Sequence, residues 1–442
     1  MTATNGATVI LGAGIIGTST AYYLSKHQPP STIHLVEPSP TLFASASGYS
    51  GGFLAKDWFA PAVAALGALS FEEHRKLAEK EDGARKWGYT RSTSVSYAPS
   101  LGTDLRSGRD GCGGAAVADV WCREGGSRAA VASGSGDSTV ADGLAPTWLK
   151  RVEGDEVAII SEEGTVAQVD PLQLSEFLLQ KCLDAGVRLH HPAKAISIHT
   201  DMRDELASVR IADTRSSTET DVPCTSIVIA AGAWSPQVFA TLFPRSDLKL
   251  PISSLAGHSL VVRQPGWWSQ ELEDRQGCHA LFVADHRPGY SPEIFSRAGG
   301  SIYVAGLNSA TEPLPPLPTD AKGNISRSAI DTLRETARDV LLGRADGNKN
   351  AGDGDGDGIE ILREGLCFRP VTDRGTPILG RIPDERLGVG VATRAGADGG
   401  VYLAAGHGPW GISMSLGTGK VMTEMVQGRK LSVDVSGLAL GG

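Results

Sequence analysis

The chain has 442 residues and a mass of 46.2 kDa, more than one ordinary domain needs and enough for two units with a large buried core. Hydrophobic residues make up 41% and charged residues 21%, and no apolar run approaches the roughly 20 residues of a membrane-spanning helix. The net charge of −9 argues against nucleic acid and anionic membranes as partners. The six cysteines show neither disulfide nor zinc spacing, so we expect no metal and a reducing, cytoplasmic location.

The first forty residues predict a βαβ unit. Residues 8–11 form an apolar strand, and the glycine-rich turn 12–17 follows it. A helix is expected over 18–26 and a second strand over 33–37. A strand, a glycine turn and a helix in this order are the context in which a dinucleotide-binding turn is expected.

The rest of the chain alternates helices and strands and is interrupted by two stretches without periodicity. Residues 102–143 are rich in Gly, Ser and Ala, and residues 344–358 end in an alternation of Asp and Gly. A calcium loop is the alternative for this alternation, but the terminal Glu of an EF-hand is missing, so we predict flexible surface insertions without chemistry. Helices are expected at 62–81, 171–185 and from 411 to about 427, and strands at 93–97, 187–189, 195–198, 226–230, 259–263, 301–305 and 401–405.

The glycine turn has the spacing of a dinucleotide fingerprint. Gly12, Gly14 and Gly17 follow the first strand, and Glu37 ends the second strand about twenty residues on. The first glycine permits the turn, the second lets a pyrophosphate approach the backbone, and the third lets helix and strand pack. Glu37 would accept hydrogen bonds from an adenosine ribose. FAD and NAD share this fingerprint, and a turn with only a packing role is the structural alternative.

Five further segments resemble the D-amino-acid oxidase-like (DAO) flavoproteins, which include sarcosine, glycine and fructosyl-amine oxidases. The resemblance is closest to the fungal and plant "FAD-dependent oxidoreductase" branch and covers most of the chain outside the two insertions. It implies FAD as the cofactor and an α/β fold, with a Rossmann-like FAD-binding domain of the glutathione-reductase type and a smaller substrate domain built on a mixed or antiparallel β-sheet. The segments are the Ser/Gly loop at 44–52, Val169-Asp170-Pro171, Ala230–Trp234, Phe368-Arg369-Pro370 and Gly406-His407-Gly408.

On this basis we predict a discontinuous FAD-binding domain from residues 1–60, 161–250 and 361–442. The substrate domain is expected from residues 84–160 and 251–343. The active site should lie between the two domains, on the exposed face of the isoalloxazine ring.

The resemblance also implies which residues contact the cofactor. The last helix begins at a Gly-Pro-rich turn, whose free N–H groups and positive dipole end would face a reduced flavin. The backbone of Ala195 is expected to face the adenine. The predicted cofactor-binding residues are Gly12, Ala13, Gly14, Ile15, Ile16, Gly17, Glu37, Ser45, Ser47, Gly51, Gly52, Ala195, Ala231, Gly232, Trp234, Cys367, Gly406, Gly408, Pro409, Trp410, Gly411 and Ile412.

Cys367 stands where the sarcosine and fructosyl-amine oxidases attach the flavin through a thioether, whereas D-amino-acid oxidases have no such link. A buried cysteine that acts as a small hydrophobe is the structural alternative. Lys56 and Trp58 follow the Ser/Gly loop, and either approach the flavin or lie at the surface.

Four residues are predicted to act at the substrate. In the resembling amino-acid oxidases, the arginine in the position of Arg369 binds the substrate carboxylate, a task that a planar guanidinium suits. Trp410 stands where the sarcosine branch carries a lysine, and would line the substrate pocket or cover the flavin edge. Tyr303 stands where relatives place an oxygen-activating lysine, which leaves fast reaction with O2 open. It either orders a water or binds substrate, or it is a half-buried tyrosine of the strand. His258 is either a polar contact of the substrate or a hydrogen-bonded structural residue.

We therefore expect oxidation of a C–N bond in an amine or amino acid by hydride transfer to flavin N5. The expected acceptor is O2, which gives H2O2, and the imine product hydrolyses. A dehydrogenase that uses another acceptor is one alternative, and a catalytically silent FAD-stabilised binding or trafficking module is another. The expected partners are a small-molecule amine or amino acid and O2, and the sequence leaves the oligomeric state open.

Overall fold

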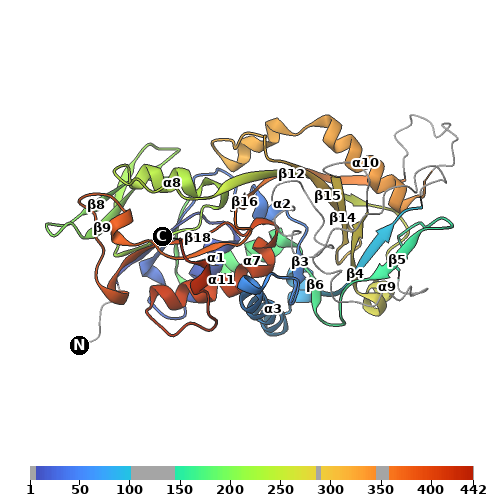
Figure 1. Cartoon of the computed structure of the whole chain (residues 1–442), viewed down its shortest axis with the longest axis horizontal. Helices are drawn as coiled ribbons and strands as arrows, with labels where there is room; N and C mark the ends of the chain where they lie inside the picture. Colours follow the sequence, from blue (N-terminus) through green and yellow to red (C-terminus); the bar gives the residue numbers. More distant parts are fainter. Residues whose placement is uncertain (1–5, 101–144, 285–289, 345–357, 442) are drawn as a thin grey trace.

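The computed structural model describes residues 6–100, 145–284, 290–344 and 358–441. The insertions predicted at 102–143 and 344–358 lie outside the described residues, apart from the two end positions 344 and 358. The described part forms three sheets, and the two largest lie side by side along the long axis of the molecule (Figure 1). Among the described residues, no helix has both the length and the apolar character that crossing a lipid bilayer requires.

The first sheet has six strands in the order β17-β18-β11-β1-β2-β7, all parallel except β17, which pairs antiparallel with β18. This order and the helices around it form the Rossmann-type layer that the resemblance implied. The strands are β1 (Thr8–Leu11), β2 (Ile33–Val36), β7 (Arg188–His190), β11 (Ser226–Ile229), β17 (Ile378–Arg381) and β18 (Gly400–Ala405).

Both faces of this sheet are buried because its strands alternate their side chains between two cores. Ile10 packs with helices on one face, while Val9 and Leu11 pack on the other face with the third sheet and α8. The helices of the first face are α1 (Ile15–Leu24), α3 (Pro61–Glu81), α7 (Pro171–Ala185) and α11 (Gly411–Val426). The other face holds β8 (Ala193–Thr200), β9 (Leu206–Asp213), β10 (Glu219–Pro223) and α8 (Ser235–Leu242).

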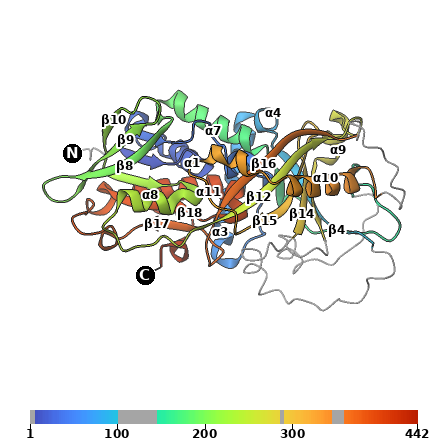
Figure 2. The same cartoon turned by 90° about the horizontal axis from the view of Figure 1, so that it is seen from above.

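The second large sheet has nine strands and is mostly antiparallel. Its long strands β12 and β16 pair over their whole length and extend from the six-stranded sheet across the molecule (Figures 1 and 2). Strands β3, β6 and β16 come from stretches predicted for the FAD-binding domain, yet they pair in this sheet. Its strands are β3 (Phe53–Ala55), β4 (Thr90–Ala98), β5 (Glu156–Ile159), β6 (Val166–Gln168), β12 (Ser253–Arg263), β13 (Cys278–Val283), β14 (Tyr290–Ser296), β15 (Ile302–Ser309) and β16 (Glu360–Val371).

The two faces of the nine-stranded sheet have different coverings. Helix α10 (Arg327–Leu341) packs its apolar side on one face, where Leu333 is fully buried. The other face carries an aromatic cluster that includes Phe53, Phe295 and Tyr303. Three further α-helices are short, namely α2 (Ala46–Tyr49), α4 (Gly83–Trp87) and α9 (Gln270–Gln276).

Helix α7 shows how local signals set an element. It covers the residues predicted for it, because Asp170 caps its start and accepts hydrogen bonds from the N–H groups of Leu172 and Gln173. Gly186 ends the helix with a φ of +101°, a conformation that favours glycine.

Candidate functional site

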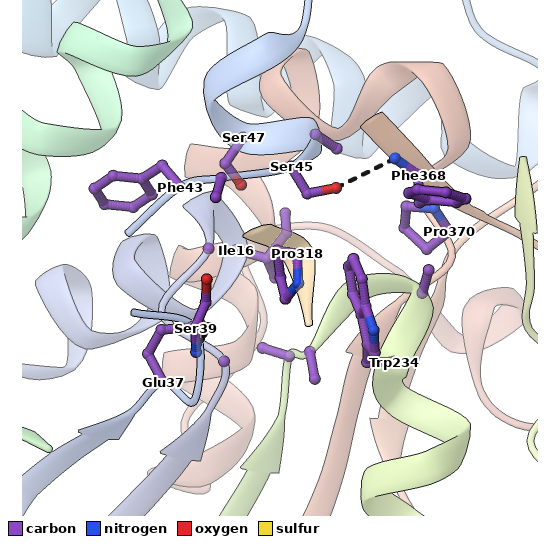
Figure 3. Close-up of a pocket in the computed structure, with 18 of the residues that line it drawn as sticks. Ile16, Glu37, Ser39, Phe43, Ser45, Ser47, Trp234, Pro318, Phe368 and Pro370 are labelled. Carbon is purple, nitrogen blue, oxygen red and sulfur yellow. Dashed lines mark hydrogen bonds between the residues drawn. The ribbon is translucent and has the colours of Figure 1, made fainter. Parts of the chain in front are cut away.

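A cavity of about 400 Å³ lies at the carboxyl ends of β1, β2 and β11, where they meet β16 and the start of α11. This is the end of a parallel sheet at which α/β proteins bind their ligands. Figure 3 shows Glu37 and Ser39 on one side of the cavity, and Phe368 and Pro370 on the other. The predicted residues that line it are Gly12, Gly14, Ile15, Ile16, Glu37, Ser45, Ser47, Ala195, Ala231, Gly232, Trp234, Cys367, Arg369, Gly408, Pro409, Gly411 and Ile412.

The turn between β1 and α1 needs glycine at two positions for packing. Gly12 has a φ of +101°, and a Cβ there would lie 2.6 Å from the carbonyl oxygen of Ala230. A Cβ on Gly17 would lie 2.0 Å from the carbonyl oxygen of Gly12. Gly14 differs, since a Cβ there meets, among the described residues, only the hydroxyl of Ser47, at 3.1 Å. Gly14 therefore keeps the backbone at the helix start open to a ligand.

The N-terminus of α1 faces the cavity. The N–H of Ile15 donates to the hydroxyl of Ser47 at 2.9 Å, which ties the helix start to the Ser/Gly loop. The other N–H groups of the first turn have no carbonyl four residues earlier within the helix. Together with the helix dipole they give this end a partial positive charge, which suits a diphosphate.

Glu37 holds the adjoining backbone with its carboxylate. Its Oε2 accepts from the N–H of Ala13 at 3.0 Å, and its Oε1 accepts from the N–H of Ser39 at 3.0 Å. Burial raises the pKa of Glu37, although these two N–H groups act to lower it. The carboxylate thus stands in the cavity wall with lone pairs left for the hydroxyls of a ribose.

The opposite end of the cavity is formed by β16 and by the turn that precedes α11. Gly408 and Pro409 belong to a short 3-10 turn, η6 (Gly408–Trp410), and Gly411 and Ile412 begin the helix. This helix has 16 residues, and its N-terminal end lines the cavity. Its partial positive charge suits the negative charge that a flavin acquires on reduction.

Arg369 lies on β16, and its guanidinium rests against the backbone of β12. Its Nη1 donates to Oδ1 of Asn308, and a Cβ on Gly257 would lie 2.5 Å from the same nitrogen. Glycine at position 257 therefore makes room for the guanidinium. Arg369 also lines the cavity, and Tyr303 is a second hydrogen-bond partner of its guanidinium, so a carboxylate there would be bound by the N–H donors that Asn308 and Tyr303 leave unused.

These residues fit FAD, because the N-terminal ends of α1 and α11 both line this cavity. Glu37 would hold the ribose of the adenosine half, and the backbone at Gly14 and Ile15 would hold the diphosphate. The turn from Gly408 to Ile412 would hold the flavin. Ala195 lines the cavity on β8 with its neighbours Lys194 and Ile196, where the adenine is expected.

Six predicted cofactor residues do not line the cavity and lie behind its wall. A Cβ on Gly51 would lie 2.6 Å from the ring of Phe295, and one on Gly52 would lie 2.0 Å from the carbonyl oxygen of Val169. Gly52 also has a φ of +84°, a conformation that favours glycine, so the backbone of the loop requires glycine at this position. The six residues are Ala13, Gly17, Gly51, Gly52, Gly406 and Trp410.

The structure separates Tyr303 and Trp410 from the cavity wall and puts them among aromatic side chains. The buried ring of Tyr303 stacks on Phe295, with centroids 5.9 Å apart. Trp410 meets the ring of Phe59 edge to face at 4.8 Å, and Trp58 is buried in the same cluster. Burial raises the pKa of Tyr303, so its phenol stays neutral.

His258 and Lys56 also lie outside the cavity wall. The Nε2 of His258 accepts a hydrogen bond from the N–H of Ser326 at 3.0 Å, at the start of α10. This contact corresponds to the structural alternative for His258. Lys56 is exposed to solvent.

Sequence reasoning missed a proline-rich strap, residues 313–318, that closes one side of the cavity. Pro316, Leu317 and Pro318 line the cavity, and the indole N–H of Trp234 donates to the carbonyl oxygen of Pro315 at 2.8 Å. Figure 3 shows Pro318 and Trp234 among the residues that line the cavity. The density of prolines was a signal for a rigid segment, but nothing local indicated what it would cover.

Trp234→Phe should weaken FAD binding about fivefold, because it removes the donor that holds the strap and keeps an aromatic ring near Phe368. Fluorescence titration of the apoprotein with FAD measures the effect. Trp268→Phe is the matched control, since its indole N–H bonds to Glu273 at the surface. Equal dissociation constants for both variants would rule out a role of the Trp234–Pro315 hydrogen bond in FAD binding.

His407 is a second lining residue that the sequence analysis did not assign. Its Nε2 lies 3.0 Å from the hydroxyl of Thr418, and its Nδ1 is buried without a partner among the described residues. Burial lowers the pKa of His407 to about 3. His74, which is buried against the carbonyl of Ile412 on α11, has its pKa lowered by burial to about 4.

These two histidines predict a loss of stability in acid. Below the ordinary histidine pKa of about 6.5, the two imidazoles become protonated in the unfolded chain but stay neutral in the native protein. The free energy of unfolding therefore falls as the pH drops from about 6.5 toward 4. Each histidine contributes a loss on the order of 1 kcal/mol per pH unit in this range. Urea unfolding at pH 7, 6 and 5 measures the slope. His407→Gln should make the slope shallower, because it removes one of the imidazoles that the native state keeps neutral.

Comparison with known proteins agrees with this geometry. The sequence pattern of the DAO family, described as "FAD dependent oxidoreductase", matches residues 7–425. A Schizosaccharomyces pombe protein named as an oxidoreductase, C1F5.03c, is 25% identical over 95% of this chain and 93% of its own length. A Saccharomyces cerevisiae protein named as an oxidoreductase, TDA3, is 23% identical over 97% of this chain and 93% of its own length.

Solved structures share the fold. Glycine oxidase from Geobacillus kaustophilus is 19% identical with a TM-score of 0.67, over 99% of this chain and 98% of its own. L-proline dehydrogenase from P. horikoshii is 15% identical with a TM-score of 0.67, over 98% of this chain and 96% of its own. The family pattern spans both large sheets and every segment of the cavity wall. The chain therefore belongs to the DAO family of FAD-dependent oxidoreductases, and FAD is its cofactor.

Proposed function

We propose that the protein oxidises the C–N bond of an amino acid to an imine, with O2 as the electron acceptor. The amine carbon and nitrogen lose two electrons and two protons in total, O2 gains them and leaves as H2O2, and water then hydrolyses the imine. Bound FAD supplies the redox chemistry, since its N5 can accept the hydride. Binding and orientation remain the task of the protein's own side chains.

The observation that carries the proposal is the position of Arg369. Its guanidinium lines the same cavity as the start of α11, and Asn308 and Gly257 hold it in place. A fixed guanidinium is suited to bind a carboxylate through two parallel hydrogen bonds. It would orient an amino acid by its carboxylate and leave the amine end toward the flavin site.

The names of structural neighbours support an amine or amino acid as substrate. They include an iminodiacetate oxidase from Chelativorans sp. BNC1, with a TM-score of 0.66 at 17% identity, and NikD, an amino acid oxidase, with a TM-score of 0.67 at 15% identity. Iminodiacetate and an amino acid, the substrates in these two names, both combine an amine with a carboxylate.

Anaerobic titration of the purified holoprotein with a panel of amino acids and amines tests the proposal. We expect rapid loss of the oxidised flavin absorbance with at least one amino acid and a much slower loss with its decarboxylated amine. A flavin that stays oxidised with every compound, in a protein that binds FAD stoichiometrically, would contradict the proposal and favour a catalytically silent role.

A dehydrogenase is the second candidate, and Tyr303 is the observation that favours it. The position that relatives use for a cationic side chain holds a buried, neutral phenol stacked on Phe295. Stopped-flow mixing of the reduced protein with aerated buffer separates the two functions. Reoxidation within seconds favours the oxidase, and reoxidation over many minutes favours another acceptor.

The flavin link at Cys367 is tested separately. Cys367 lines the cavity but is buried, and burial raises the pKa of its thiol, so little reactive thiolate is present. We therefore expect FAD to be released into the supernatant when the holoprotein is precipitated with acid. Flavin retained in the pellet, and lost from the pellet of Cys367→Ala, would show the thioether instead.

A further inference from the structure

The Ser/Gly loop, residues 44–52, is held from behind by side chains of the nine-stranded sheet. Arg297, which follows β14, donates through Nη2 to the carbonyl oxygens of Ser50 at 2.7 Å and Gly51 at 3.3 Å. Arg363, on β16, donates through Nη1 to the carbonyl oxygen of Gly48 at 3.0 Å. The loop is thus bound by two cationic side chains that do not themselves line the cavity.

Both arginines bring positive charge that is only partly offset. Arg297 is 5% exposed, and its ion pair among the described residues is with Asp170 at 3.4 Å. Asp170 also accepts two N–H bonds as the cap of α7, so its charge is shared. Arg363 lies over the ring of Tyr49 at 4.7 Å, and the described residues offer it no carboxylate within ion-pair distance. A guanidinium stays charged even when buried.

The cavity side of the same loop presents groups that suit an anion. Ser45 and Ser47 line the cavity, and their hydroxyls accept N–H bonds from Phe368 at 3.2 Å and Ile15 at 2.9 Å. A hydroxyl that accepts in this way can direct its own proton to a ligand oxygen. With the carbonyls of Gly48, Ser50 and Gly51 bonded to the arginines, the negative ends of these peptides are held away from a phosphate.

We propose that Arg297 and Arg363 are positioning residues for FAD, which hold the Ser/Gly loop in its anion-binding conformation and place positive charge behind it. We call this pair the arginine anchor. It makes cofactor binding depend on the nine-stranded sheet as well as on the Rossmann-type layer, because Arg363 lies on β16 and Arg297 directly follows β14. The inference concerns cofactor affinity and stands whatever the substrate is.

The test is FAD affinity of the apoprotein, measured by quenching of flavin fluorescence. Arg297→Met should raise the dissociation constant at least tenfold, the size expected for losing charged hydrogen bonds. Arg297→Lys keeps the charge but not the planar guanidinium, and should give a smaller rise in the dissociation constant. Arg327→Met is the matched control, because Arg327 is 75% exposed and pairs with Glu364 rather than with a carbonyl of the loop.

A second measurement separates an effect on phosphate binding from a general loss of structure. Calorimetric titration of Arg363→Met with ADP and with adenosine should show weaker binding of ADP, about fivefold or more, and no change for adenosine. Equal losses for both ligands, or FAD constants for Arg363→Met and Arg297→Lys within twofold of the unmodified protein, would overturn the proposal. This holds even if Arg297→Met does not fold. Because no turnover is measured, a failed substrate screen leaves the result unaffected.

Discussion

Replacing Arg369 with methionine is expected to lower kcat/KM for an amino-acid substrate about 100-fold, because two charge-assisted hydrogen bonds to the carboxylate are lost. The rate with a matching amine that has no carboxylate should change less than about twofold, since those bonds are never made. Flavin reduction under anaerobic conditions, followed by stopped-flow absorbance with each compound, measures both numbers.

Two further variants show whether this effect arises at the guanidinium. Gly257→Ala puts a methyl group 2.5 Å from Nη1 of Arg369, so it should reproduce much of the loss without removing the charge. Arg263→Met removes a half-exposed arginine that pairs with Glu360, and should have no effect. An Arg369→Met variant that is reduced by the amino acid as fast as the unmodified enzyme would contradict the assigned role.

Replacing each of two glycines in the first turn with alanine should have different effects on stability and on FAD binding. Gly17→Ala gains helix propensity of about 1 kcal/mol, but its methyl group would lie 2.0 Å from the carbonyl oxygen of Gly12, against rigid backbone. Overpacking of this kind costs about 3 kcal/mol or more, so the clash exceeds the gain. We expect a large drop in the urea midpoint and loss of FAD.

Gly14→Ala should instead leave a folded apoprotein. Gly14 has a φ of −65°, which alanine adopts freely, and the added methyl group meets only the Ser47 hydroxyl at 3.1 Å among the described residues. We expect a urea midpoint close to that of the unmodified protein and a dissociation constant for FAD at least tenfold higher, because the methyl group stands where the diphosphate approaches. Tight FAD binding by Gly14→Ala would argue against the diphosphate position.

The aromatic cluster and the strap show where sequence reasoning was incomplete. Tyr303 was predicted to act at the substrate from its strand position, yet the fold packs its ring on Phe295 and away from the cavity wall. The proline-rich strap was not assigned at all, although Pro318 reaches the cavity. Neither contact leaves a local pattern, because each depends on which strands pair and on where a distant loop passes.

What the sequence determined by itself was the start of the FAD site and the order of its elements. The strand 8–11, the glycine turn and the capped helix 171–185 follow from short-range causes, namely side-chain periodicity, glycine conformation and the Asp170 cap. Only the tertiary structure decided that Arg297 and Arg363 hold the Ser/Gly loop and that Trp234 bonds to Pro315. These partners lie tens to hundreds of residues apart, so their meeting depends on how the two sheets pack, which no local spacing encodes.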